Sequence, residues 1–230
     1  MFTPARHSTP EFLDDPATAP SWIATSGNDI ANCNRLFGGR RALLAELTPL
    51  WPSLRPTATL LDIGCGVGDL PAVARADAKR HGVTLRTIAL DRRELLARRA
   101  RSNVDVALVG DGFSIPLPDT SVDIVTACQF LHHFSDTDIA RLAREMHRVA
   151  RHRVVISDLR RSWLAAGGVW LASWPLRLHP ITRHDGVASV LKGFLASELA
   201  ATIQHAVERP VRVVSRPAFR LTASWTPSSQ

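Results

Sequence analysis

The stretch "LLDIGCGVGDL", residues 60–70, places three glycines, Gly64, Gly66 and Gly68, at alternate positions directly after a run of apolar residues. The apolar run predicts a buried strand, and the residues from 69 to 81 predict the helix that follows it. Because glycine has no Cβ, three of them in one strand-to-helix turn indicate a sharp bend or a close approach to a ligand. The sequence therefore predicts a binding site where this strand ends.

The alternation of strand and helix patterns continues along the chain. Further strands are predicted over 83–91, 104–111, 121–131 and 152–159, with helices over 92–101 and 136–150 between them. Strands and helices that alternate in this way predict a parallel sheet covered on both faces, which binds ligands at the carboxyl ends of its strands. After a helix with Ser197 as its N-cap, two short runs at 211–217 and 219–225 predict an antiparallel hairpin.

The first part of the chain has a different pattern. Residues 1–27 are rich in Pro, Thr and Ser and predict an irregular arm. The residues that follow have helical spacing, interrupted at a Gly-Gly pair. We therefore expect an N-terminal arm and helical cap over 1–56, and one α/β domain over 57–230 with an insertion at about 160–195 that acts as a lid.

The composition favours one folded domain without a nucleic-acid partner. The 230 residues are 45% hydrophobic and 21% charged, which is enough for one sizeable core. The formal charge is +7, but only Lys79 and Lys192 are lysines, and the arginines form short pairs without interleaved aromatic residues. Cys33, Cys65 and Cys128 are widely spaced, which predicts reduced thiols and no metal site. The N-terminus lacks a signal-peptide pattern, so we expect a cytoplasmic location.

The glycine spacing is G-x-G-x-G, preceded by Asp62, and differs by one residue from the G-x-G-x-x-G of dinucleotide-binding folds. This stretch resembles motif I of the class I S-adenosylmethionine-dependent methyltransferases. The resemblance continues with Asp91 at the end of the second strand, "GDGFSIPLPDTSVDIV" (110–125) and "QFLHHF" (129–134). The last motif is similar to small-molecule enzymes of the ubiquinone/menaquinone-biosynthesis type. The resemblance covers 57–159 well and implies S-adenosylmethionine as the cofactor.

The resemblance also implies a fold and a set of cofactor contacts. The implied fold is a doubly wound, seven-stranded, mostly parallel, Rossmann-like sheet with an antiparallel C-terminal hairpin and a helical N-terminal cap. In it, Asp62 braces the glycine loop, Asp91 holds the ribose hydroxyls and Asp111 accepts a hydrogen bond from the adenine amino group. The helical segment before the domain resembles the entry of a bacterial group linked to aromatic polyketide pathways, which adds Asn34 and Arg35 as contacts. The implied cofactor-binding residues are Asp62, Gly64, Cys65, Gly66, Gly68, Asp91, Arg92, Asp111, Gly112, Phe113 and Gln129.

Candidate catalytic residues lie outside these motifs. His132 and His133 follow the fourth strand, near where the methyl group should point, and we favour His133 as the general base. Asp158 and Arg160 leave the fifth strand at the same edge, where they can face the acceptor. His184, which has an acid next to it, is a second candidate base. The alternative roles are loop ordering for the histidines, helix capping for the acid, and a surface position for the arginine.

The stretch "WLAAGGVWLASWPL" (163–176) is apolar but too short to span a bilayer. It predicts a pocket wall for a flat or lipophilic acceptor, or transient contact with a membrane surface. Core packing and a dimer contact are the alternatives. We expect an enzyme that methylates a small aromatic or lipophilic acceptor at oxygen, with carbon methylation of a quinol as the second interpretation.

Two other classes of protein stay open. Asp91 also suits a nicotinamide-dependent oxidoreductase, but the glycine spacing differs, and a chain without any tyrosine lacks the Tyr-x-x-x-Lys pair of one such subtype. A cofactor-binding subunit without turnover would keep the same acids. Nucleic-acid methylation is disfavoured because no Asn-Pro-Pro-Tyr or Asp-Pro-Pro-Tyr motif follows the fourth strand.

Overall fold

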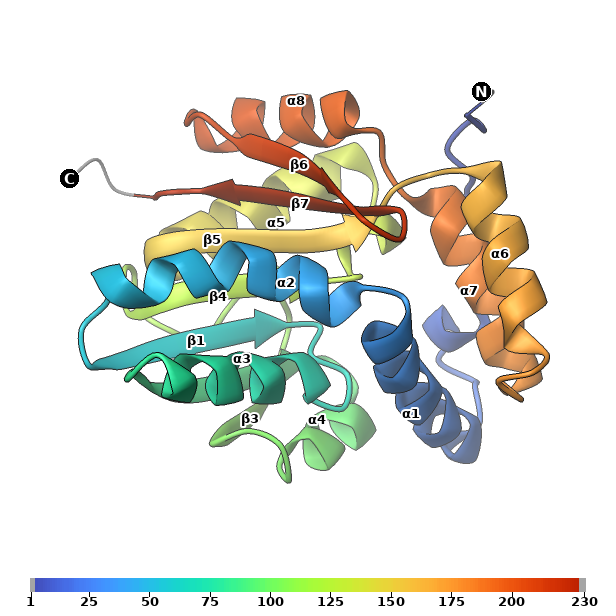
Figure 1. The fold of residues 1–230 in the computed structure, drawn as a ribbon, viewed down its shortest axis with the longest axis horizontal. Coiled ribbons are helices and arrows are strands. Elements are labelled where there is room, and N and C mark those ends of the chain that lie inside the picture. The colour runs from blue at the N-terminus through green and yellow to red at the C-terminus, as the bar shows by residue number, and fades with distance from the viewer. Residues whose placement is uncertain (1–2, 228–230) are drawn as a thin grey trace.

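The computed structural model describes residues 3–227 and centres on a seven-stranded sheet (Figure 1). The strand order is β3-β2-β1-β4-β5-β7-β6. Strands β1 to β5 are parallel, whereas β7 is antiparallel to both β5 and β6. The strands are β1 (Thr57–Ile63), β2 (Thr84–Asp91), β3 (Val106–Val109), β4 (Val122–Cys128), β5 (Ala150–Leu159), β6 (Arg212–Arg216) and β7 (Arg220–Trp225). This topology confirms the predicted sheet and its C-terminal hairpin.

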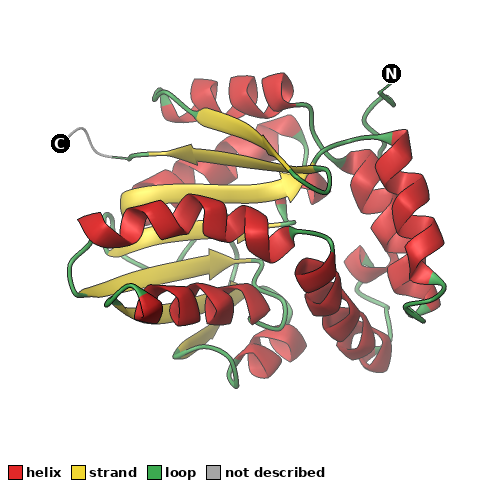
Figure 2. Cartoon of the chain, viewed as in Figure 1, coloured by secondary structure: helices red, strands yellow, loops and turns green. Residues whose placement is uncertain are grey.

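Helices cover both faces of the sheet (Figure 2). The flanking helices are α2 (Gly39–Leu47), α3 (Asp69–Arg80), α4 (Glu94–Ala100), α5 (Asp136–Val149) and α8 (Ala196–Val207). Neighbouring residues of β1 point to opposite faces, so Leu60 packs with α2 and α3 while Leu61 packs with α5 and α8. Because both faces are covered, every residue of β4 is buried and the strand shows no alternation in burial.

The N-terminal arm is shorter than predicted. Helix α1 (Pro20–Leu36) begins at Pro20, inside the segment expected to be irregular. Proline suits the first turn of a helix because its fixed φ matches the helix and its missing N–H is not needed there. Packing then outweighs the Ser and Gly content, since Ser26 and Gly27 are buried. The expected break at the Gly-Gly pair is confirmed, because Gly38 has a φ of 79°.

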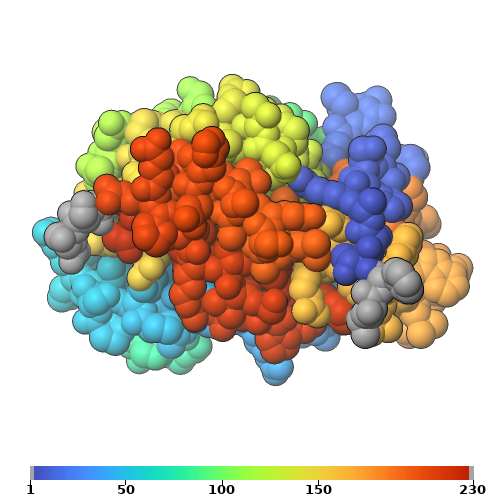
Figure 3. Space-filling model, turned by 90° about the horizontal axis from the view of Figure 1, so that it is seen from above, coloured from blue at the N-terminus to red at the C-terminus, as the bar shows by residue number. Residues whose placement is uncertain are grey.

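Helices α6 (Trp163–Ser173) and α7 (Pro180–Lys192) of the predicted lid lie beyond the carboxyl edge of the parallel strands, as do the 3-10 turns η1 (Phe12–Asp14) and η3 (Leu131–His133). The 3-10 turn η2 (Thr48–Ser53) lies at the opposite edge, directly before β1. The arm crosses to the lid, where the His7 N–H donates to Leu191 O at 3.2 Å (Figure 3). Among the described residues, no helix has the length and apolar content needed to cross a membrane.

The start of α8 differs from the prediction that Ser197 is its N-cap. The N-cap is Leu195, and the Glu198 carboxylate accepts a hydrogen bond from the Leu195 N–H at 3.0 Å. The helix therefore starts two residues before the predicted position. A carboxylate in the first turn satisfies a free backbone donor in place of the serine hydroxyl.

Glu46 of α2 is a buried carboxylate that connects the N-terminal helices to the C-terminal strands. Its Oε1 accepts a hydrogen bond from the Thr222 hydroxyl at 2.7 Å, and its Oε2 accepts one from Ser224 at 3.0 Å. The Arg216 guanidinium also donates to Oε1. Burial opposes ionisation, but these donors hold the pKa of Glu46 below its ordinary value.

Replacing Glu46 by alanine is expected to lower the free energy of unfolding by about 3 kcal/mol, because the buried hydroxyls of Thr222 and Ser224 lose their acceptor and the half-buried Arg216 loses its counter-ion. Urea denaturation at pH 7 measures this change. Glu94→Ala is the matched control, since Glu94 forms only an exposed pair with Arg98, and we expect a change below about 0.5 kcal/mol. Equal losses in the two variants would contradict the role given to Glu46.

Candidate active site

A cavity of about 850 Å³ opens where the carboxyl ends of the parallel strands meet the lid. Its wall includes nearly all of the predicted cofactor-binding residues, namely Asp62, Gly64, Cys65, Gly66, Asp91, Arg92, Asp111, Gly112, Phe113 and Gln129. Gly68 does not line the cavity. A Cβ there would lie 3.2 Å from the Ala100 Cβ and 3.3 Å from Val104 Cγ1, so this glycine instead allows close packing of α3 and α4.

Two backbone N–H groups of the glycine loop donate hydrogen bonds to β2. Gly64 and Gly66 have φ values of 66° and 55°, which favour glycine. The Gly64 N–H donates to Leu90 O at 2.8 Å, and the Gly66 N–H donates to Asp91 Oδ2 at 3.0 Å. A Cβ at Gly64 would collide with the Phe130 ring, whereas one at Gly66 would meet open space. The loop therefore offers room to a ligand but few free donors to a phosphate.

Three carboxylates surround this loop and line the cavity. Burial, together with the nearby charges of Asp69 and Asp91, raises the pKa of Asp62 to about 7, although the hydrogen bond from Thr126 opposes this shift. Burial also raises the pKa of Asp69 and of Asp91. Arg40 offsets part of this charge, because its Nη2 lies 3.6 Å from Asp69 Oδ2. A desolvated group of like charges favours a positively charged ligand.

The two acids predicted to bind the nucleoside differ in burial. Asp91 is 9% exposed, and its Oδ1 accepts a hydrogen bond from the Arg93 N–H at 2.9 Å. Asp111 is exposed, and its Oδ1 accepts a hydrogen bond from the Phe113 N–H at 3.0 Å. A Cβ at Gly112 would lie 2.9 Å from Ile63 Cγ2, so glycine lets this turn approach the end of β1. Both acids keep unused lone pairs at the cavity wall.

Gln129 connects the end of β4 to α1 and α3. Its φ of 50° is unusual for a residue with a side chain, and its Nε2 donates a hydrogen bond to Asn34 Oδ1. Asn34 is buried, and its Nδ2 donates to Asp69 Oδ1 at 3.3 Å. Of the two predicted contacts, Asn34 lines the cavity and also holds two of its residues, whereas Arg35 does not line it.

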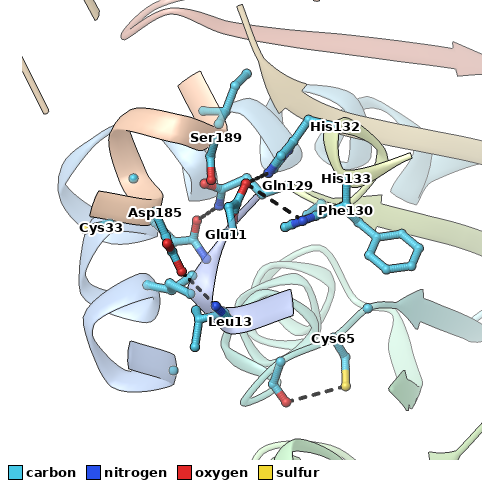
Figure 4. Close-up of a pocket in the computed structure, with 18 of the residues that line it drawn as sticks. Glu11, Leu13, Cys33, Cys65, Gln129, Phe130, His132, His133, Asp185 and Ser189 are labelled. Atoms are coloured by element: carbon cyan, nitrogen blue, oxygen red, sulfur yellow. Dashed lines mark hydrogen bonds and ion pairs between the residues drawn. The ribbon is translucent and has the colours of Figure 1, made fainter. Parts of the chain in front are cut away.

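His132 has one ring nitrogen held by a buried carboxylate and the other at the cavity wall. Its Nδ1 lies 2.7 Å from Asp158 Oδ1, and since an ionised carboxylate only accepts, Nδ1 carries the proton. Burial opposes ionisation of Asp158, but the electrostatic attraction to His132 and the hydrogen bond between them hold the pKa of Asp158 below its ordinary value. Within the described chain, His132 Nε2 is buried without a hydrogen-bond partner. It lies 3.8 Å from Glu11 Oε1, and both residues line the cavity (Figure 4).

His133, which the sequence favoured as the base, is engaged by the arm. Its Nδ1 lies 3.0 Å from Asp14 Oδ2. Burial opposes protonation, but this hydrogen bond and the charge of Glu11 raise the pKa of His133 above its ordinary value. A raised pKa favours the protonated form of the imidazole, which cannot accept a proton. The structure therefore gives His133 the contacts of an anchor for the arm.

The arm brings Glu11 into the site through contacts that no local motif predicts. Asp185 Oδ1 accepts a hydrogen bond from the Phe12 N–H at 3.0 Å, and its Oδ2 accepts one from the Leu13 N–H at 2.9 Å. The ammonium Nζ of Lys192 lies 3.2 Å from Glu11 Oε1. The sequence did not predict Glu11 as a site residue, because Glu11 lies far in sequence from the glycine loop and from the other cofactor motifs.

Three of the four predicted catalytic residues lie outside the cavity wall. Asp158 is fully buried behind His132. The Arg160 guanidinium lies 5.0 Å from the centre of the Phe219 ring. His184 has an acid partner, as predicted, but its side chain is 44% exposed and it does not line the cavity. The structure therefore brings together His132, His133 and Asp158, and leaves Arg160 and His184 apart from them.

The pair formed by His133 and Asp14 makes stability depend on pH. Because the pKa of His133 is raised, its stabilisation is complete below about pH 6.5 and is lost as the pH rises through the raised value. We expect His133→Asn to lower stability at pH 6 by about 1–2 kcal/mol and to flatten the fall of the melting temperature above pH 6.5. The matched control is His205→Asn, because His205 is an exposed residue of α8 and its replacement should keep the wild-type profile. An unchanged slope in His133→Asn would contradict the assignment.

Comparison with known proteins finds a methyltransferase domain in the central part of the chain. Residues 61–156 match a methyltransferase domain family. The chain is 33% identical over 143 residues to a ubiquinone/menaquinone biosynthesis C-methyltransferase, UbiE, of Burkholderia multivorans. The matched segment covers 59% of this chain and 56% of the relative. The chain is 40% identical over 97 residues to the 27-O-demethylrifamycin SV methyltransferase of Amycolatopsis mediterranei, covering 40% and 34%. The chain thus spans about half or less of the length of these curated relatives.

A solved structure supports the same fold over most of the chain. The S-adenosylmethionine-dependent methyltransferase from Aquifex aeolicus superposes with a TM-score of 0.61 at 21% identity, covering 91% of this chain and 99% of the other. The motifs at the cavity, the family match and this topology agree with one another. Residues 61–156 therefore carry a methyltransferase domain, and the fold of the chain is that of S-adenosylmethionine-dependent methyltransferases.

Proposed function

We propose that this protein transfers a methyl group from S-adenosylmethionine to a hydroxyl oxygen of a small aromatic or lipophilic acceptor. The observation that carries the proposal is the buried Nε2 of His132, which has no hydrogen-bond partner in the described chain and belongs to a residue of the cavity wall. Asp158 fixes the other ring nitrogen. A neutral imidazole held in this way accepts a proton from a hydroxyl group.

The cavity residues fit the cofactor better than they fit a dinucleotide. When bound, S-adenosylmethionine supplies a methyl group already activated by the positive charge of its sulfonium. The carboxylates of Asp62, Asp69 and Asp91 suit that charge. A pyrophosphate would need free backbone donors at the start of α3, but Gly66 N–H is used by Asp91, and α3 begins with the acid Asp69. This arrangement weighs against the nicotinamide-dependent alternative.

Individual cofactor contacts follow from the position of each residue. We assign the ribose hydroxyls to Asp91, whose two oxygens keep lone pairs at the cavity wall. We assign the adenine to the turn formed by Asp111, Gly112 and Phe113. The remaining predicted residues of the cavity wall, Asp62, Gly64, Cys65, Gly66, Arg92 and Gln129, would surround the rest of the cofactor.

His132 acts as the general base in this proposal. It takes the proton of the acceptor hydroxyl at Nε2, and the Asp158 carboxylate stabilises the imidazolium that forms. Glu11 adds a second negative charge, because its Oε1 is 3.8 Å from Nε2. Removing the proton raises the electron density on the oxygen that receives the methyl group. Asp158 acts through His132 and is therefore a positioning residue.

The lid supports a lipophilic acceptor. Its lining residues Leu164, Ala165, Val169 and Leu178 are apolar and keep water away from the reacting oxygen. We infer that residues 160–195 form the lid of a domain that spans 57–230. The same base would form the phenolate needed for carbon methylation of a quinol, which is the second candidate because one relative is named a C-methyltransferase.

Asp91→Asn is expected to weaken the binding of S-adenosylhomocysteine about 5- to 100-fold, because charge-assisted hydrogen bonds to the ribose are lost. Isothermal titration calorimetry measures this change. Asp119→Asn removes an acid that is 74% exposed and should leave the affinity within twofold. Unchanged affinity in Asp91→Asn, or tighter binding of NADH than of S-adenosylhomocysteine by the wild type, would contradict the cofactor placement.

His132→Asn is expected to lower kcat by about 10²- to 10⁴-fold while S-adenosylhomocysteine affinity stays within twofold. The assay follows methyl transfer to alkylphenols, alkylresorcinols and an alkylhydroquinone, and NMR of the methyl carbon separates oxygen from carbon methylation. His205→Asn is the control for the substitution itself.

Asp158→Asn is expected to lower kcat and change its pH profile, as a positioning residue should. Transfer to carbon would contradict the proposed oxygen acceptor. Cofactor binding without transfer to any of these phenols would favour a subunit without turnover.

A further inference from the structure

Four of the six tryptophans lie half exposed near the lid. Trp163, Trp170 and Trp174 belong to α6 and its C-cap and are 54%, 52% and 54% exposed. Trp22 of α1 is 48% exposed and lies near the lid, with its ring centre 6.0 Å from that of His179. The other two, Trp51 and Trp225, are each 1% exposed. Large apolar side chains are costly to expose, so tryptophans gathered at one end of a molecule mark an interaction surface.

Helix α6 is built with its large residues pointing outward. On a period of 3.6 residues, positions 163, 170, 171 and 174 fall on one face. Leu171 on that face is 66% exposed, whereas the opposite face carries the buried small residues Ala165 and Ala166. An ordinary amphipathic helix of a globular protein places its large apolar residues against the core. We call Trp163, Leu164, Trp170, Leu171, Trp174 and Leu176 the outer face of α6; each is at least 39% exposed.

Two arginines lie at the C-terminal end of this face. Residues 159–184 contain no Asp or Glu, and of their four arginines Arg161 is buried and paired with Glu198, whereas Arg177 and Arg183 lie beside the end of α6. Arg177 is exposed in the turn after α6, and the Arg183 guanidinium lies 3.7 Å from the centre of the Trp174 ring. Arginine beside exposed tryptophan suits the headgroup region of a bilayer, where the indole sits at the boundary and the cation meets lipid phosphate.

We propose that the outer face of α6 docks the protein on the surface of an anionic lipid bilayer. Helix α6 has 11 residues, so it lies in the interface and does not cross it. Self-association through this face fits less well. Two copies would bring arginines together without an acid from 159–184 to pair with them. The bilayer supplies the negative charge that residues 159–184 of a second copy lack.

The docking face and the cavity share one helix. Leu164, Gly168 and Val169 of α6 line the cavity, and Leu164 is also 62% exposed. A lipophilic acceptor dissolved in the bilayer would thus meet the wall of the cavity at the docking face. This link to the acceptor depends on the proposed function, but docking itself requires neither cofactor nor acceptor.

The test is flotation of the full chain with vesicles at 0.1 M salt. Vesicles of phosphatidylcholine with 30% phosphatidylglycerol are compared with vesicles of pure phosphatidylcholine. We expect the wild type to bind the anionic vesicles at least fivefold more tightly, with a blue shift of tryptophan fluorescence. The double variant Trp170→Ser/Trp174→Ser should lose at least fivefold in binding. Val109→Ser removes an apolar residue that is 53% exposed outside this face and should bind as the wild type does.

The contribution of charge is tested separately. Arg177→Gln should weaken binding to anionic vesicles at least twofold. Replacement of the exposed Arg144 of α5 by Gln should leave this binding unchanged. Melting temperature and S-adenosylhomocysteine affinity report folding and cofactor binding, so loss of docking is distinguishable from failure of the proposed function. The proposal is overturned if the wild type binds neither vesicle, if the double variant binds as well as the wild type, or if sedimentation shows that the face instead joins two copies of the chain.

Discussion

The hydrogen bonds that β2 accepts from the glycine loop are the constraint on which the site depends. Leu90 O and the Asp91 carboxylate receive the N–H groups of Gly64 and Gly66, and this pulls the loop back toward the second strand. The turn is possible only with positive φ at both glycines. Because these N–H groups already donate to β2, few of them remain to bind a phosphate. The loop and the acids beside it instead offer open space and negative charge to a ligand. The preference for a cationic nucleoside over a dinucleotide follows from this one arrangement.

Electrostatics then divides the cavity into two regions. Around the glycine loop, Asp62 and Asp91 are buried and Asp69 is half buried, and burial raises the pKa values of all three. Near η3, the buried acid Asp158 is paired with His132, and its pKa is lowered. Unpaired buried carboxylates cost free energy that a positively charged ligand offsets, whereas a paired carboxylate fixes its histidine permanently. The first region is suited to binding and the second to proton transfer.

The arm and the lid decide which residues of the second region are available. Asp185 holds the backbone after Glu11, and Asp14 holds His133, so the arm lies over one side of the cavity. The family match spans 61–156 and includes neither the arm nor the lid. In the proposed function, the contacts that would select an acceptor therefore come from outside the matched residues. Their physical basis is a set of contacts between segments that are far apart in sequence.

The sequence by itself determined the sheet, the glycine loop and the acids at the strand ends, because these depend on local periodicity and on spacing within single strand-to-helix units. Strand positions and the hairpin agree with the structure for that reason. The start of α1 and the N-cap of α8 do not, because burial of Ser26 and the reach of the Glu198 carboxylate outweighed local propensity.

Only the tertiary structure decided which histidine keeps a free nitrogen. His132 and His133 are adjacent in sequence, and their roles are set by Asp158 and Asp14, which lie on different elements. The tertiary structure also shows that the tryptophans of α6 point outward. The sequence of α6 could not predict this, because the helix has no polar side that would indicate its orientation. A local pattern cannot specify a partner that the chain brings from a distance.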